Sequence, residues 1–147
     1  MRAMLGRTGS CSRIAGAVAI AIAGSGCQSL ERVDECRAVT RLSNPILADI
    51  DRQHMDVRAT VYRNIATEYE SLASSATQIK IRTKRVAEAL NDYQRMLHEA
   101  ARDARSFADA LDAKDEARIA ITRTSAARTL RHEATSIARL DAACRFR

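Results

Sequence analysis

The chain has 147 residues, of which 29% are charged, 46% are hydrophobic and only 3% are aromatic, with no tryptophan. This length corresponds to one domain, whose core must be built mainly from alanine, leucine, isoleucine and valine. All five glycines precede residue 27, and the single proline is Pro45. Sandwiches, barrels and doubly wound sheets need many turns that are rich in both residues. The hundred residues after Pro45 contain neither, and therefore predict long helices.

The first 26 residues have the features of a secretory signal peptide. Residues 1–13 carry three arginines and no acid, and residues 14–23 form an unbroken apolar run. A transmembrane helix needs about 20 apolar residues, so this run is too short to be one. A buried core helix is the alternative, but it leaves the basic flank unexplained. Removing residues 1–26 lowers the net charge from +6 to +3, because 21 basic residues then face 18 acidic ones.

Two cleavage sites compete at the end of this segment. Ala21-Ile22-Ala23 fits an ordinary signal peptidase. Gly24-Ser25-Gly26-Cys27 resembles the lipobox of bacterial lipoproteins, although Gly24 stands where an aliphatic residue is usual. The resemblance implies that Cys27 becomes the lipid-bearing first residue, and that Gln28 is compatible with sorting to the outer membrane, facing the periplasm. The chain is similar to small all-helical lipoproteins of the myxobacterial kind.

Counting cysteines favours the lipobox site. Cys11 is removed with the signal peptide under either mode of cleavage. Cleavage after Ala23 leaves Cys27, Cys36 and Cys144, an odd number in an oxidising compartment. Lipobox cleavage uses Cys27 as the lipid anchor and leaves the other two free to pair. We therefore predict a lipid on Cys27 and a disulfide between Cys36 and Cys144.

Apolar residues at spacings of three and four predict four helices in the mature chain, at about 30–52, 58–78, 84–111 and 115–142. Residues 28–35 are expected to form a short polar tether. Pro45 either kinks the first helix or starts a new one after Asn44, and the unbroken apolar register favours the kink. The third helix is the clearest, and the following residues share its apolar face: Val86, Leu90, Tyr93, Leu97, Ala100, Ala104, Phe107 and Leu111. On the last helix the predicted inward face holds Ala120, Ala127, Leu130, Ala134, Ile137 and Leu140.

The position of the predicted disulfide distinguishes between two helix counts. Cys36 lies near the start of the first helix and Cys144 near the end of the last. A disulfide requires their Cα atoms to lie about 4.4–6.8 Å apart. Three helices, with residues 30–78 fused into one rod, would place the cysteines at opposite ends. We therefore predict an all-α, antiparallel, up-down four-helix bundle formed by residues 27–147.

No catalytic or cofactor-binding pattern occurs in the chain. The three histidines form no E-x-x-H pair of the di-metal bundles, and no phosphate-binding glycine loop or nucleophile elbow is present. Ionic residues at helical spacing are expected to form a solvated face. We therefore predict a protein that is not an enzyme and that binds neither a metal nor a cofactor.

Arginines on the last helix form the one candidate binding surface. They are Arg128, Arg131, Arg139, Arg145 and Arg147. Such a surface fits anionic envelope material or an acidic partner, and a solvated helix face is the alternative. Nucleic acid is not expected, because the protein is exported and no aromatic residues interleave the charges. The sequence predicts a membrane-anchored, non-enzymatic envelope module, with a small-ligand-binding or sensing bundle in the periplasm as the alternative.

Overall fold

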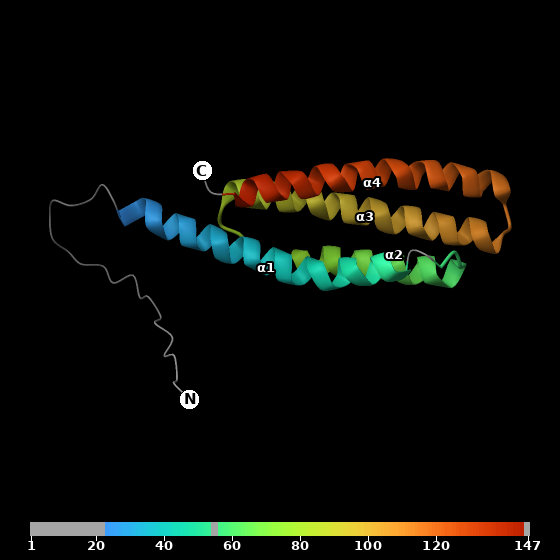
Figure 1. Cartoon of the computed structure of the whole chain (residues 1–147), viewed down its shortest axis with the longest axis horizontal. Helices are drawn as coiled ribbons and strands as arrows, with labels where there is room; N and C mark the ends of the chain where they lie inside the picture. The colour runs from blue at the N-terminus through green and yellow to red at the C-terminus, as the bar shows by residue number, and fades with distance from the viewer. Residues whose placement is uncertain (1–22, 54–55, 146–147) are drawn as a thin grey trace, which may run out of the picture.

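The computed structural model of the protein describes residues 23–53 and 56–145. This part of the chain forms four α-helices and no strand: α1 (Ala23–Gln53), α2 (Ala59–Ala76), α3 (Lys84–Asp112) and α4 (Glu116–Cys144). Each helix runs antiparallel to the one before it (Figure 1). The predicted all-α four-helix bundle is confirmed.

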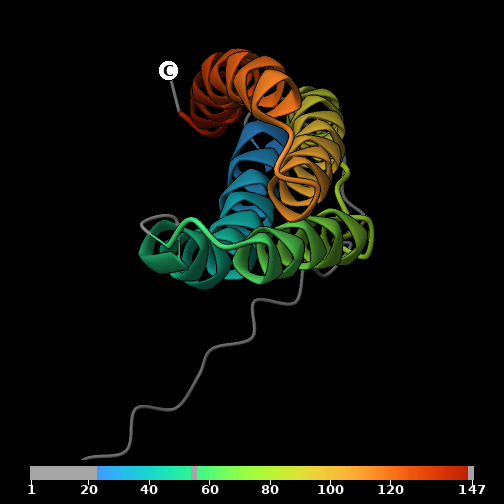
Figure 2. The same ribbon diagram turned by 90° about the vertical axis from the view of Figure 1, so that its right-hand side faces the viewer.

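The four helices are not packed equally against one another. The central helix α3 packs closely along both α2 and α4, whereas α1 lies mainly against α2. Viewed from the end, α1 and α2 form one layer and α3 and α4 the other (Figure 2). The side between α1 and α4 is the loosely closed side of the bundle, and it determines where the candidate site lies.

The face of α3 that the sequence predicted to be apolar forms the centre of the core. Seven of its eight residues are buried, and Leu111 is partly buried. Leu97 and Tyr93 pack with Leu72 of α2 and Val39 of α1 in the largest cluster. Burying a side chain of this size stabilises the fold by roughly 1.5–3 kcal/mol, so α3 supplies the main apolar contacts that hold the other helices.

The first helix differs from its prediction at its start. It begins at Ala23 rather than near residue 30, so the residues expected to form a tether are helical. Nothing in residues 28–35 ends a helix, since this stretch has no glycine or proline and includes good helix formers such as Leu30 and Arg32. The first turns of α1 extend beyond the other helices (Figure 1). The helix also continues through Pro45, which excludes a new helix starting there.

The turn between α3 and α4 ends one helix and starts the next within three residues. The N–H of Asp115 donates to the carbonyl of Ala110, and the N–H of Lys114 donates to that of Leu111, each at 3.1 Å. This is the Schellman pattern, and it places Lys114 at a φ of 51°, a value that favours glycine. The carboxylate of Asp115 then accepts a 3.0 Å hydrogen bond from the N–H of Arg118 and caps α4.

The face that the last helix presents to the bundle differs in part from the one that the sequence predicted. Ala120, Ala127 and Ala134 are exposed, and Ile137 retains 42% of its accessible surface. Leu140 packs against the core as predicted. Among the described side chains of α4, the buried ones are Ile119, Ser136 and Ala143. The prediction was wrong for the exposed residues because α4 packs on α3 partly through polar side chains, which a search for apolar periodicity overlooks.

Candidate functional site

The disulfide between Cys36 and Cys144 joins α1 to the last turn of α4. The two Cα atoms lie 5.9 Å apart, and the cysteines are separated by 108 positions in the sequence. Cys36 lies in the cluster formed by Val86, Ala89 and Ala143. The predicted pairing is confirmed, and it fixes α1 at one end of the side where α1 and α4 are otherwise loosely packed.

The neighbouring residue Glu35 ties the α2–α3 connection to the same end of the bundle. Its carboxylate oxygen Oε1 accepts hydrogen bonds from the N–H groups of Arg82, at 2.5 Å, and Thr83, at 3.2 Å. Burial alone would raise the pKa of this carboxyl group. The two backbone N–H groups and the charge of Arg82 outweigh burial, so the pKa of Glu35 lies below its ordinary value.

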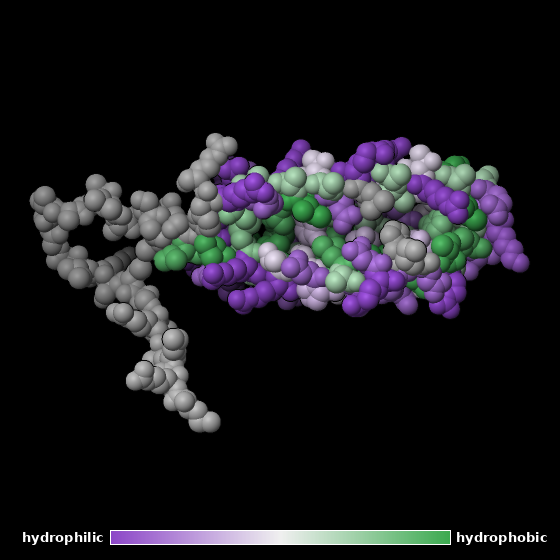
Figure 3. All heavy atoms as spheres, viewed as in Figure 1, coloured by the Kyte–Doolittle hydropathy of each residue, from purple (hydrophilic) through white to green (hydrophobic). Residues whose placement is uncertain are grey.

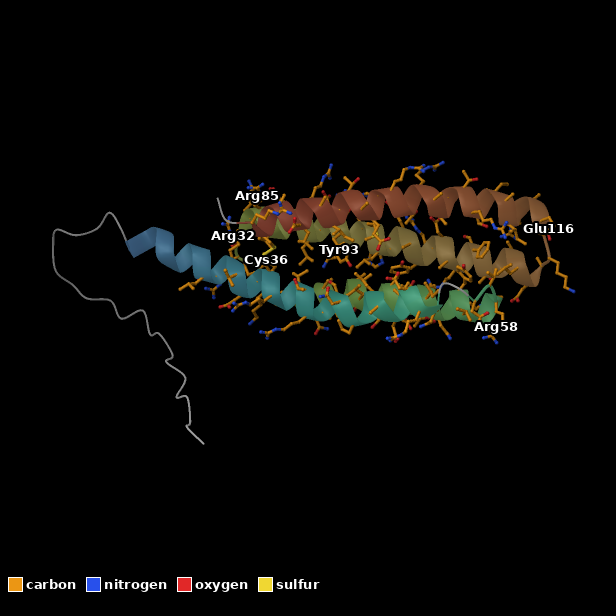
Figure 4. All side chains as sticks on the ribbon, viewed as in Figure 1. Arg32, Cys36, Arg58, Arg85, Tyr93 and Glu116 are labelled. Carbon is orange, nitrogen blue, oxygen red and sulfur yellow. A yellow bond between two sulfur atoms is a disulfide. The ribbon has the colours of Figure 1, made fainter. Side chains whose placement is uncertain are left out.

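Basic residues gather at the end of the bundle that carries the disulfide. Residues 31–41, 80–88 and 141–145 contain eight basic and five acidic side chains. At the opposite end, residues 49–53, 56–63 and 109–118 contain five basic and seven acidic ones. Figure 4 shows Arg32 and Arg85 near Cys36 at the first end, and Arg58 and Glu116 at the other. The charge of the bundle is therefore polarised along its long axis.

The arginines predicted to bind anions occupy unequal environments. Arg139 lies 2.8 Å from Asp92 on α3, and Arg145 lies 2.5 Å from Asp141 one turn earlier on α4. Arg128 and Arg131 are exposed, with no salt bridge to the described residues. Arg147 lies outside the described residues. Of the predicted arginines that the structure describes, Arg128 and Arg131 are therefore the two without a salt bridge to another described residue.

The interface between α3 and α4 is held by carboxylates of α3. Asp103 accepts hydrogen bonds from Ser125, at 2.9 Å, and Thr129, at 2.5 Å. Glu99 lies 2.8 Å from Nδ1 of His132. These bonds explain why α4 turns a polar stripe toward α3 and leaves its alanine-rich side toward α1.

A cavity of about 280 Å³ lies on the side of the bundle between α1 and α4. Its walls come from all four helices and from Val57 before α2. Exposed hydrophobic side chains lie along the middle of this face, between hydrophilic ones on both edges (Figure 3). On the α4 side the wall is formed by small residues, Ala126 and Ala127. These side chains are too short to reach across to α1, and the space between the helices stays open.

Three of the five aromatic residues in the chain line this cavity: Tyr62, Tyr69 and Phe107. The rings of Tyr62 and Phe107 make an edge-to-face contact with centroids 4.6 Å apart. Burial raises the pKa of Tyr69, and the nearby charge of Glu133 raises it further. Burial also raises the pKa of Tyr62, while Arg123 opposes this effect. Both phenols are therefore neutral at physiological pH.

The cavity also has charged walls. Asp103 and Glu133 provide two carboxylates, and Arg123 provides one guanidinium. The two hydroxyls that bond Asp103 are neutral, and no salt bridge with the described residues reaches this carboxylate. These residues were not predicted from the sequence, because aromatic residues at helical spacing are typical of a core and charged ones of a solvated face. The sequence signal that could have revealed the cavity is the concentration of the few aromatic residues on α2 and α3.

The described residues contain no group of three histidine, cysteine or acidic side chains arranged to hold a metal ion. Within the same residues, no helix combines the length and apolar character needed to cross a membrane. Comparisons of the chain with protein-family models, with curated proteins and with solved structures find no match.

Proposed function

We propose that the protein is a lipid-anchored, non-enzymatic helical module of the bacterial cell envelope. A lipid on Cys27 holds it at the outer membrane, where the bundle faces the periplasm. The observation that carries this proposal is the disulfide between Cys36 and Cys144. With these two cysteines paired, Cys27 is the one cysteine after the predicted signal peptide that remains for a lipid.

The charge distribution of the bundle supports this orientation. Cys27 precedes Cys36 by nine positions in the helix α1, a distance of roughly 14 Å at 1.5 Å per residue. The end that carries the disulfide, which is the basic end, therefore lies next to the anchor. Basic residues close to a membrane that contains anionic lipids contribute about 1 kcal/mol each to binding. The acidic end points away from the surface.

In this proposal the exposed part of the module binds an envelope protein or an anionic polymer. Arg128 and Arg131 lie near the middle of α4, away from the anchored end, and their side chains are exposed. Charge complementarity at such positions increases the rate of association with an acidic partner. Binding through these two arginines should weaken as the ionic strength rises.

Metabolic labelling with palmitate, followed by membrane fractionation, tests the proposal. The wild-type protein should take up label and sediment with membranes, and Cys27→Ala should do neither. Cys11→Ala is the matched control, because it removes a cysteine inside the predicted signal peptide and should leave both properties unchanged. A soluble and unlabelled wild-type protein would refute the anchor and favour cleavage after Ala23.

The cavity favours a second function, the binding of a small ligand in the periplasm. Its volume of about 280 Å³ is near the lower limit of typical ligand pockets. Such pockets combine apolar walls with a few polar groups, and this cavity does the same. Titration calorimetry with compact aromatic ligands tests this function, and heat of binding that disappears in Ala127→Trp would place the ligand there.

A further inference from the structure

The cavity between α1 and α4 has a chemistry that selects among small ligands. Its aromatic walls come from Tyr62 and Tyr69 of α2 and Phe107 of α3. The face of an aromatic ring carries partial negative charge. An ammonium group placed over that face is stabilised by about 0.5–2 kcal/mol. A cluster of three rings in a chain with five aromatic residues is therefore a feature that points to a cationic ligand.

The charged residues in the cavity wall also favour a cationic ligand. Asp103 lies part-way down α3 and is half-buried, and its orientation is fixed by the hydroxyls of Ser125 and Thr129. These bonds orient the carboxylate and leave its negative charge in place. Glu133 adds a second carboxylate from α4, one that also makes other interactions. Such groups stabilise a cation more strongly inside a cavity than on the surface, because solvent screens them less.

The one basic residue in the wall does not reverse this preference. Arg123 lies on α4 and its side chain is exposed. Asp103 is the carboxylate in the wall that makes no salt bridge with the described residues, and its charge faces the cavity side of the bundle with the neutral hydroxyls of Ser125 and Thr129 as its hydrogen-bond donors. An anionic ligand such as a fatty acid would have to approach the Asp103 carboxylate while leaving water. Its charge therefore opposes binding, whereas the charge of an amine favours it.

We propose that the cavity binds a compact organic ammonium ion, with its apolar body against Ile50 and Ile65 and its cationic group facing Asp103 and the tyrosine rings. This inference rests on the second function proposed above, the binding of a small ligand. It adds the chemical class of that ligand. Binding involves no covalent step and leaves the protein chemically unchanged.

A matched set of three probes tests the charge preference with the purified full chain. Phenethylamine, 2-phenylethanol and 3-phenylpropionate share a phenyl ring and a two-carbon linker, and they carry a positive, a neutral and a negative end group. Titration calorimetry should show phenethylamine binding about tenfold more tightly than 2-phenylethanol. The carboxylate probe should be the weakest of the three.

Variants separate the charge from the shape of the cavity. Asp103→Asn keeps the size of the side chain and should weaken phenethylamine about tenfold while leaving 2-phenylethanol unchanged. Tyr62→Leu should weaken phenethylamine severalfold through loss of the ring face. Glu88→Gln is the control, since it removes an exposed carboxylate on α3 near the disulfide end and should change neither affinity. Far-ultraviolet circular dichroism verifies that each variant is folded.

The possible outcomes distinguish the proposed class of ligand from the proposed function of binding any small ligand. Equal affinities for the amine and the alcohol would overturn the cation preference and leave ligand binding standing. Tightest binding of the carboxylate would show that Arg123 dominates, and would likewise overturn it. Absence of binding by all three probes to the folded wild-type protein would refute both the ligand class and the second function.

Discussion

Removing the disulfide should cost the protein a large part of its stability. The bond between Cys36 and Cys144 closes a loop of 108 positions in the unfolded chain. In the chain-entropy model, closing such a loop lowers the entropy of the unfolded chain by about 16 cal/mol/K, which stabilises the fold by about 4.8 kcal/mol at 25 °C. Domains of this size are stable by roughly 5–15 kcal/mol. The double variant Cys36→Ala/Cys144→Ala should therefore lose between about a third and nearly all of this stability.

Urea denaturation followed by circular dichroism measures this effect. With a slope of about 2 kcal/mol/M, the unfolding midpoint of the double variant should fall by about 2.4 M. A reducing agent should shift the wild type toward the same midpoint and leave the variant unaffected. Hydrogen exchange should accelerate most in α1, because that helix lies mainly against α2 and is tied to α4 by the bond. A midpoint shift below about 0.3 M on reduction would refute the reasoning.

Three further predictions concern single side chains. Glu35→Gln should cost about 1–2 kcal/mol at neutral pH. Because the fold lowers the pKa of Glu35, this contribution is present above the ordinary value of 4.5 and is lost as the pH falls below it, as denaturation at several pH values would show. Lys114→Gly should raise the melting temperature, since glycine relieves about 1 kcal/mol of strain at a φ of 51°, and a lower value would contradict the assigned turn. Leu97→Ala should cost about 2–5 kcal/mol in urea denaturation, whereas Ile121→Ala, at a residue 68% exposed, should change the stability by less than about 0.5 kcal/mol.

The sequence was sufficient to predict the helix order and the disulfide. The pattern from Val86 to Phe107 is long and regular, so its buried face followed directly from a helical period. The requirement that Cys36 and Cys144 meet at one end then excluded an odd number of helices. Both inferences use constraints that act along the whole chain and do not depend on side-chain detail.

Other features depend on packing that periodicity does not reveal. The orientation of α4 is set by Asp103, which bonds Ser125 and Thr129, and these polar residues look like a solvent face in the sequence. The cavity follows from that orientation, because it leaves Ala126 and Ala127 opposite α1. The start of α1 was predicted too late because the polar residues after Cys27 were interpreted as a tether, although their helix propensities are good.

The central claim, a lipid anchor on Cys27, is tested most directly by mass spectrometry of the mature N-terminus. The protein is purified from membranes and digested with trypsin, which cuts after Arg32. We predict a peptide of residues 27–32 whose first cysteine carries a diacylglyceryl thioether. A peptide that begins at Gly24 and contains an unmodified Cys27 would contradict the claim.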